Sequence, residues 1–396
     1  MKKILFVSHG SELYGAMRSL MDAIILLDRE HYESIVIAPK KGPLIRELEK
    51  HGIVSYLLRM PSWHFPSRSM GGYSHSRTEF LVAVVKTVLK LLLFEVPATI
   101  RIIRIIQKAG IDLVYTNSSA VHSGALAAFF TKKPHVWHIR ENMDSKDGGY
   151  RFILPKRLSF AIMCKLSAAI VANSKSTAAQ FDQISSCSNV IVIYNGIYTR
   201  EYAEVHQDND SLTESRGKWQ VAVIGSLCEM KSQEDAIKAV GIASQNIGEI
   251  ELLLIGDGRT AYKEHLKNLA GDLCLSEKVV FTGFIDDVLR ILPNMKVVLV
   301  PSISESFGRV AIEAMAAGVP VIAADVGGLS EIITDGFNGI LVPRRSPEAI
   351  ANKLIFIYTN PQKSQELIKN AQDWVYSNCD VVQYSRRIEE VISSLL

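Results

Sequence analysis

Short apolar runs with strand character alternate with helical segments along almost the whole chain, and they do so in two series. The first series contains runs such as ILFVS (4–8) and HVWHI (135–139). The second opens at QVAVIG (220–225) and continues through VVLV (297–300). Strands that alternate with helices favour parallel sheets, because a parallel pair of strands needs a long crossover connection. The sequence therefore predicts an α/β fold with two Rossmann-like domains that face a cleft.

The two series are separated by a polar segment from Tyr198 to Lys218 that lacks apolar periodicity, which is typical of a linker. The chain of 396 residues is long enough for two domains of ordinary size. We therefore predict an N-terminal domain over 1–197, a linker over 198–218, a C-terminal domain over 219–378 and a final helix over 379–396.

The net charge of +3 hides an asymmetry between the two halves of the sequence. Residues 1–196 contain 25 basic and 14 acidic residues, a balance of +11, whereas residues 197–396 contain 19 and 27, a balance of −8. A basic first half suggests an anionic partner, such as a membrane surface or a phosphorylated acceptor. No nucleic-acid-binding motif supports a nucleic-acid partner.

The five cysteines have neither CxxC nor metal-ligand spacing, and their number is odd. This pattern predicts reduced thiols in a cytosolic protein. The first residues, MKKILFVSHG, contain too short an apolar run for a signal peptide and fit a first strand. We therefore expect a cytoplasmic location.

Residues 80–108 form an apolar segment that also carries positive charge. It carries one acidic residue, Glu95, and five basic residues: Lys86, Lys90, Arg101, Arg104 and Lys108. These charges and Pro97 interrupt the segment too often for a membrane span. Two basic amphipathic helices that contact an anionic membrane surface, on the inner face of the membrane, fit the pattern. The alternative is an ordinary Rossmann helix with a solvated basic stripe.

The segment after VVLV (297–300) carries two glutamates, Glu305 and Glu313, in a predicted strand–loop–helix unit whose helix spans Arg309 to Ala317. In an open α/β sheet, ligands bind at the carboxyl ends of the strands, and the first amides of a helix favour an anion. The two carboxylates can accept hydrogen bonds from hydroxyl groups. A ligand that has both phosphate and many hydroxyls is a sugar nucleotide.

The same segment continues as EAMAAGVPVIA, a glycine pair at 327–328 and DGFNGILVP. In this pattern the chain resembles the retaining glycosyltransferases of family four, which have the GT-B fold. The resemblance implies metal-independent transfer, without a cofactor, of a sugar from a nucleotide-diphosphate donor, with Glu313 on the ribose and Glu305 on the donor sugar. The donor diphosphate would lie on the amides of four residues: Phe307, Gly308, Arg309 and Val310. The last helix would cross back onto the first domain.

Two further stretches extend the resemblance, with departures. In VIGSLCEMKSQ (223–233), Lys231 matches a diphosphate-binding lysine, but Ser226 stands where the family usually has arginine. In SHGSELYGAM (8–17), only Gly15 remains of a usual glycine pair close to the diphosphate. His138, at the end of HVWHI, corresponds to a histidine that faces the donor sugar. We therefore count Glu305 and His138 as candidate catalytic residues.

Three further residues are candidates for the acceptor side: Tyr14, Arg18 and Arg140. Asp208 and Asp210 form a DxD pattern, but they lie in the polar linker, so we expect no metal site. The expected activity is transfer from a UDP-sugar, in preference to a GDP-sugar, to a glycan or lipid-linked acceptor in cell-surface polysaccharide synthesis. The alternatives are a non-catalytic sugar-nucleotide-binding component of a polysaccharide assembly complex, for which Ser226 is the best support, and an epimerase or phosphorylase on the same fold.

Overall fold

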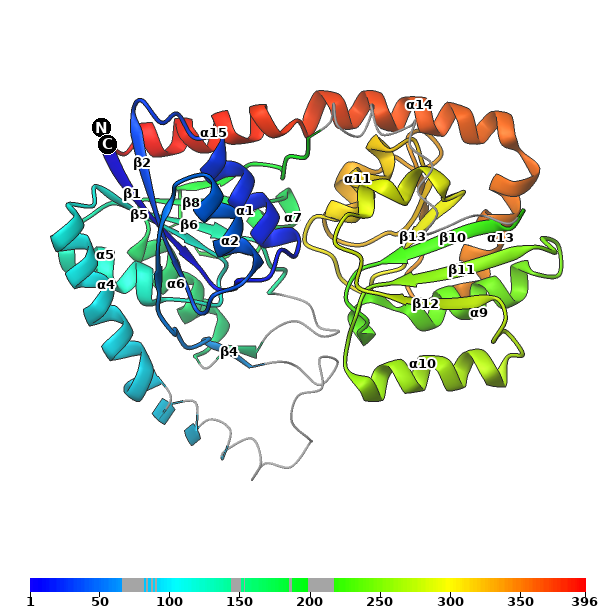
Figure 1. Cartoon of the computed structure of the whole chain (residues 1–396), viewed down its shortest axis with the longest axis horizontal. Helices are drawn as coiled ribbons and strands as arrows, with labels where there is room; N and C mark the ends of the chain where they lie inside the picture. Colours follow the sequence, from blue (N-terminus) through cyan, green and yellow to red (C-terminus); the bar gives the residue numbers. More distant parts are fainter. Residues whose placement is uncertain are drawn as a thin grey trace. The chain divides into compact units, whose positions relative to one another are not determined.

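The computed structural model describes residues 1–65, 91–143, 151–152, 154–184, 187–198 and 217–396, together with helical residues 82, 85, 86, 88 and 89. These residues divide into two compact units (Figure 1). The first unit comprises Met1–Gly196 and Val381–Leu396, and the second comprises Ile197–Asp380. Most of the predicted linker, including Asp208 and Asp210, lies outside the described residues.

The first unit is built on a parallel sheet with the strand order β3-β2-β1-β5-β6-β8-β9. Its strands are β1 (Lys2–Ser8), β2 (Tyr32–Ala38), β3 (Val54–Leu57), β5 (Leu113–Asn117), β6 (His135–Ile139), β8 (Ala169–Ala172) and β9 (Val190–Val192). Its helices are α1 (Gly15–Ile25), α2 (Pro43–Lys50), η2 (Leu91–Glu95), α4 (Val96–Ala109), α5 (Ser123–Thr131), α6 (Lys156–Leu166), α7 (Lys175–Ala179) and α15 (Val381–Ser393). A two-stranded antiparallel ribbon joins β4 (His64–Phe65) to β7 (Arg151–Phe152).

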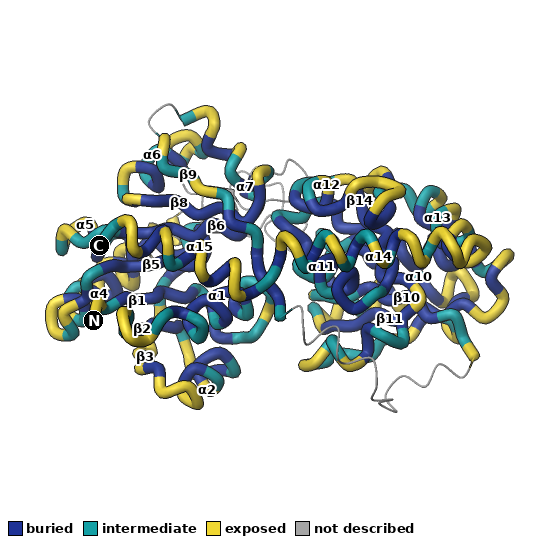
Figure 2. Tube along the Cα trace, turned by 90° about the horizontal axis from the view of Figure 1, so that it is seen from above, coloured by how far each residue is buried: buried dark blue, intermediate teal, exposed yellow. Residues whose placement is uncertain are grey.

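Helices cover both faces of this sheet, and the alternation of side chains along β1 shows why. Ile4 and Phe6 pack against residues of α1, α2 and α15, whereas Leu5 and Val7 pack against residues of α4 and α5. Successive strand residues point to opposite faces, so a strand buried on both sides reads as a continuous apolar run. In Figure 2 the central strands of this sheet, such as β1, β5 and β6, are drawn mainly as buried, whereas the edge strands β3 and β9 are not.

The second unit repeats this plan with the order β12-β11-β10-β13-β14-β15, again parallel throughout. Its strands are β10 (Trp219–Ile224), β11 (Ile250–Ile255), β12 (Val279–Gly283), β13 (Val297–Val300), β14 (Val321–Ala324) and β15 (Ile340–Val342). Its helices are α9 (Gln233–Ala243), α10 (Thr260–Asp272), α11 (Arg309–Ala316), α12 (Leu329–Ile332), α13 (Pro347–Thr359) and α14 (Pro361–Asn378), with short 3₁₀ turns at Glu229–Lys231, Val288–Arg290 and Leu292–Asn294.

In each sheet the strand order reverses once, between β1 and β5 in the first unit and between β10 and β13 in the second. Such a switch point leaves a crevice at the carboxyl ends of the two strands, because their following connections run to opposite faces. The prediction of an α/β fold made of two Rossmann-like domains is confirmed.

The final helix, α15, belongs to the core of the first unit. Ile388 and Ile392 are fully buried in the same cluster as Ile4 and Phe6. The Tyr384 hydroxyl donates a hydrogen bond to the carbonyl of Ser19 in α1, with an O–O distance of 3.1 Å. Residues 381–396 therefore complete one face of a sheet whose first strand begins at Lys2.

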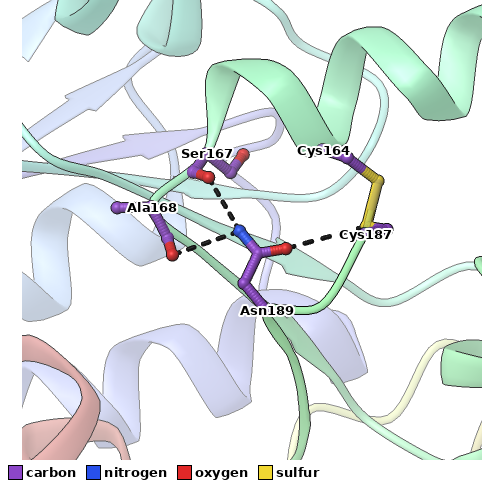
Figure 3. Close-up of a disulfide and its surroundings, with 5 residues drawn as sticks. All are labelled: Cys164, Ser167, Ala168, Cys187 and Asn189. Carbon is purple, nitrogen blue, oxygen red and sulfur yellow. Dashed lines mark hydrogen bonds between the residues drawn. A yellow bond between two sulfur atoms is a disulfide. The ribbon is translucent and has the colours of Figure 1, made fainter. Parts of the chain in front are cut away.

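The expectation that the cysteines are all reduced thiols is wrong for Cys164 and Cys187, which form a disulfide with Cα atoms 5.4 Å apart (Figure 3). Cys164 lies near the end of α6, and Cys187 lies three residues before β9. The Asn189 amide donates hydrogen bonds to the carbonyls of Ser167 (2.8 Å) and Ala168 (3.1 Å). These bonds hold the start of β9 against the turn after α6, and so bring two sulfur atoms together that are far apart in sequence.

Candidate active site

The loop after β13 carries Glu305, and two glycines give this loop its shape. Gly308 has a φ of +101°, a left-handed conformation that favours glycine, and it turns the chain into α11. The Gly328 amide donates to the carbonyl of Glu305 at 3.0 Å. A Cβ at Gly328 would lie 2.4 Å from the Cα of Phe307, so only glycine allows this close approach.

Lys231 reaches the same point from the neighbouring strand. It ends the 3₁₀ turn Glu229–Lys231 after β10, and its Nζ forms a short ion pair with Oε2 of Glu305. The Ser302 hydroxyl also donates to Oε2 of Glu305, at 3.3 Å. Burial by itself lowers the pKa of Lys231, but the charge and hydrogen bond of Glu305 outweigh this effect and raise that pKa. A cation and a carboxylate therefore meet at the β10–β13 switch point, with Lys231 charged.

A second ion pair follows along α11. The Arg309 Nε donates to Oε1 of Glu313 at 2.8 Å, and the two side chains are only 13% and 12% exposed. Phe307 is buried, whereas Val310 is half-buried. The first amides of a helix have no acceptor within the helix and attract anions, so the start of α11 is a suitable place for a phosphate group. The structure thus brings the donor-side candidates of the second unit to one edge of its sheet.

His138 lies in β6 of the first unit and is fully buried. Its Nδ1 lies 2.6 Å from the Tyr115 hydroxyl and 3.2 Å from Nη2 of Arg140, whereas its Nε2 has no hydrogen-bond partner among the described residues. Burial, together with the charge of Arg140, lowers the pKa of His138 well below its usual value. We therefore expect a neutral imidazole. Its contacts with Tyr115 and Arg140 would help to fix the carboxyl ends of β5 and β6.

Arg140 is also buried, with 5% of its surface exposed. Its guanidinium donates to the side-chain oxygens of Asn117 and Asn195, the latter at 2.6 Å, and to the hydroxyl of Tyr384 at 2.9 Å. These bonds connect the ends of β5 and β6 to α15. This placement favours a role for Arg140 in supporting the site, in contrast to the expected contact with an acceptor.

The remaining candidates surround the start of α1. Gly15 is the first residue of α1, Tyr14 before it is 56% exposed, and the Arg18 Nε donates to the carbonyl of Leu13 at 3.0 Å. Tyr14 lines a cavity of about 500 Å³ at the carboxyl ends of β1, β2 and β3. The cavity is lined by His9, Gly10, Ser11, Glu12, Tyr14, Met17, Pro39, Lys40 and Arg59.

Two family models match most of the chain between them. The model "Glycosyltransferase Family 4" matches residues 15–201, and the model "Glycosyl transferases group 1" matches residues 205–374. The chain belongs to glycosyltransferase family 4. The predicted GT-B fold and glycosyltransferase activity are therefore confirmed.

Known relatives of this family 4 glycosyltransferase include proteins from an archaeon and from bacteria. An uncharacterized glycosyltransferase of Methanocaldococcus jannaschii is 28% identical over 274 residues, which cover 68% of this chain and 72% of that protein. The D-inositol 3-phosphate glycosyltransferase of Mycolicibacterium gilvum is 34% identical over 139 residues, or 34% of this chain and 30% of that protein. The crystal structure of Anabaena Alr3699/HepE in complex with UDP is 25% identical, covers both chains fully and has a TM-score of 0.77.

Sequence reasoning missed two basic residues of this glycosyltransferase that line the cavity, Lys40 and Arg59. Lys40 forms an ion pair with Glu12 at 2.8 Å, and the guanidinium of Arg59 lies 5.5 Å from the centre of the Phe94 ring. Both residues come two positions after a strand, β2 or β3. The rule that ligands bind at strand ends could have found them.

Within the part of the glycosyltransferase that the structure describes, no group of three or more His, Cys, Asp or Glu side chains is placed to hold a metal ion. Over the same residues, no helix combines the length and the apolar character that a membrane crossing demands.

Proposed function

We propose that this glycosyltransferase transfers a sugar with retention of anomeric configuration from a nucleotide-diphosphate donor, a UDP-sugar in preference to a GDP-sugar. The acceptor is a glycan or a lipid-linked sugar of cell-surface polysaccharide synthesis. The observation that carries the proposal is the meeting of Lys231 and Glu305 at the β10–β13 switch point, beside the start of α11. UDP as the nucleotide is supported by the complex of Anabaena Alr3699/HepE with UDP.

Each donor group has a proposed partner in the second unit. Lys231 and the amides from Phe307 to Val310 hold the diphosphate, which is the charge that grows as the donor bond breaks. Glu313 accepts hydrogen bonds from the ribose hydroxyls, and Glu305 accepts them from the donor sugar. Because Lys231 is paired with Glu305 in the structure, the donor diphosphate takes over part of that interaction when it binds.

The reaction needs no group that the chain and its substrates do not supply. The acceptor hydroxyl oxygen forms a bond to the anomeric carbon on the face from which the diphosphate leaves. The bond from that carbon to the diphosphate oxygen breaks, and its electron pair stays on the diphosphate. The acceptor proton passes to the departing phosphate oxygen. Lys231 and the α11 amides lower the barrier by stabilising the charge on the leaving group.

Nucleotide binding is the first test. A ligand that binds the folded state raises its melting temperature, so we expect UDP and a UDP-sugar to raise Tm more than GDP and a GDP-sugar. Lys231→Ala should abolish most of this shift, because the diphosphate loses its cation. Lys238→Ala, which removes a surface lysine of α9 with a partner at 3.9 Å, is the matched control.

Retention is tested on the product. The glycosidic bond formed with a panel of acceptors is assigned by NMR, and we expect the anomeric configuration of the donor. An inverted product, or the absence of a Tm shift with every nucleotide, would overturn the proposal. Release of an epimerised nucleotide sugar without transfer would favour the epimerase alternative.

A further inference from the structure

Residues 82–100, which lead into α4 and include its first turns, expose many apolar side chains. Nine of their described side chains are large, apolar and exposed, and we call them the apolar patch: Val82, Val85, Val88, Leu89, Leu92, Leu93, Phe94, Val96 and Ile100. Leu92 and Leu93 are 61% and 65% exposed. A contiguous exposed apolar surface of this kind indicates a binding partner, because water solvates it poorly.

The exposed apolar residues lie along successive helical stretches. Val82, Val85 and Leu89 are helical and follow each other at intervals of three and four, and Val96 and Ile100 lie four apart in α4. Between them, the π-helix η2 exposes Leu92, Leu93 and Phe94. The opposite side of α4 is already occupied, since Ala98, Ile102 and Ile106 are buried in the core of the first unit. The α4 part of the patch, Val96 and Ile100, therefore faces away from that core.

Positive charge accompanies the apolar patch. The exposed row at four-residue intervals along α4 begins with Val96 and Ile100 and continues with Arg104 and Lys108. Arg101 and Lys86 are exposed as well, and the single acidic side chain of this stretch, Glu95, is buried. An apolar surface flanked by cations is the pattern of helices that lie in the interface of an anionic bilayer.

A second copy of the chain is a less suitable partner for this surface. Two copies that met through the apolar patch would bring Lys86, Arg101 and Arg104 of one copy close to the same cations of the other, and like charges repel. Anionic lipid headgroups are attracted to these cations instead, and each basic residue near such a surface contributes favourably.

The apolar patch borders the cavity of the first unit. Arg59 lines the cavity and also stacks on Phe94 of the patch. Lipid headgroups in contact with the patch would therefore lie beside the cavity mouth, within reach of groups such as Arg59, Lys40 and Tyr14.

We propose that the apolar patch docks on an anionic lipid bilayer and that the acceptor is a lipid whose polar headgroup enters the cavity next to it. The choice of a lipid acceptor rests on the proposed function. The docking surface stands without it.

Vesicle flotation tests the docking surface. The full chain is mixed with vesicles of phosphatidylcholine alone, or with about a third phosphatidylglycerol, at low and at physiological salt. We expect binding to the anionic vesicles that weakens as salt increases, because salt screens the charge attraction. The double variant Leu92→Glu/Leu93→Glu should bind at least tenfold more weakly, whereas Phe337→Glu, at an exposed position of the second unit, should bind like the wild type.

A charge-matched pair of variants separates a specific surface from overall charge. Arg101→Glu/Arg104→Glu should weaken vesicle binding at least tenfold. Lys369→Glu/Arg386→Glu makes the same change in net charge at two exposed positions elsewhere and should weaken it much less. Equal losses in the two variants would mean that the surface is not specific, and would overturn the proposal.

Light scattering in vesicle-free buffer completes the test. Absence of binding to anionic vesicles would overturn the docking surface. A wild-type dimer that becomes monomeric in Leu92→Glu/Leu93→Glu would assign the patch to a second copy of the chain.

Tm shifts with UDP are measured on the same variants. Normal vesicle binding without any nucleotide binding would reject the proposed function but keep the docking surface. Normal nucleotide binding without vesicle binding would reject the docking surface but keep the proposed function. If vesicle binding and nucleotide binding both hold but only water-soluble acceptors accept sugar, the lipid acceptor is wrong.

Discussion

Glu313 is the residue whose proposed role can be measured most directly. It lies just over one turn into α11, and its carboxylate faces Arg309. Replacement by alanine removes hydrogen bonds to the donor ribose, each worth roughly 1.5–3 kcal/mol when one partner is charged. Since about 1.4 kcal/mol corresponds to a factor of ten, we expect Glu313→Ala to raise the donor KM more than tenfold. Steady-state kinetics of UDP release checks this result.

Glu313→Gln is the matched control for this prediction. The amide oxygen of glutamine still accepts a hydrogen bond, so the rise in the donor KM should be smaller than with alanine. An unchanged donor KM in Glu313→Ala would remove the ribose assignment.

His135 predicts a pH dependence of stability. Burial lowers its pKa to about 3, while an unfolded chain has an ordinary histidine pKa of about 6.5. Between these values the unfolded state binds a proton that the folded state does not, so the free energy of unfolding falls as the pH falls. From pH 7.5 to 5.5 this one residue should lower it by about 1.4 kcal/mol. Urea titrations at both pH values measure the loss in the wild type.

The test for His135 is a comparison of slopes. His135→Gln loses hydrogen bonds to Thr116 and Ser167 and is expected to be less stable at every pH. Its stability should nevertheless fall less between pH 7.5 and 5.5 than that of the wild type. Equal falls in both proteins would show that His135 takes up a proton in the folded state.

At the scale of elements, the contact between α12 and the β13–α11 loop keeps Glu305 in place. Alanine at Gly328 would put a Cβ 2.5 Å from the carbonyl oxygen of Ser306, so the loop must move. We expect Gly328→Ala to lower the free energy of unfolding by about 1–3 kcal/mol and to reduce kcat/KM, because overpacking shifts the backbone. Gly248→Ala is the control, since no atom lies within 4 Å of its added Cβ, and it should stay within about 0.5 kcal/mol of the wild type. Similar unfolding curves for the two variants would contradict the tight contact.

Most strands were predictable from the sequence to within about two residues, because a strand buried on both faces needs an unbroken apolar run, as in HVWHI and VVLV. The strand β15 was missed, since its three residues are too short for any pattern.

The ion pair between Lys231 and Glu305 was also missed, although both residues were candidates. Their contact depends on β10 and β13 being neighbours, which is a long-range pairing that no local pattern records. The burial of Arg140 and the Cys164–Cys187 disulfide have the same origin, because each joins segments that only the folded chain brings together.

At the scale of the whole molecule, the first unit depends on a helix encoded after the second unit. Ile388→Ala removes a fully buried side chain of α15, and such truncations cost about 2–5 kcal/mol. We expect faster amide hydrogen exchange in β1, β2 and β5, with β10 and β13 unchanged. Val382→Ala, at a position of the same helix that is 49% exposed, should leave both units unchanged. Equal loss of protection in both units would show that they unfold together.

The position of α15 also has a consequence for how the protein is made. A nascent chain leaves the ribosome from its N-terminus, so all the strands of the first sheet emerge long before residues 381–396 that cover them. Until translation reaches α15, the apolar surface around Ile4 and Phe6 stays partly bare, while the second unit already has its complete sequence. During synthesis, therefore, the half of the protein that is made first should be the last to finish folding, and chaperones should hold it in the meantime.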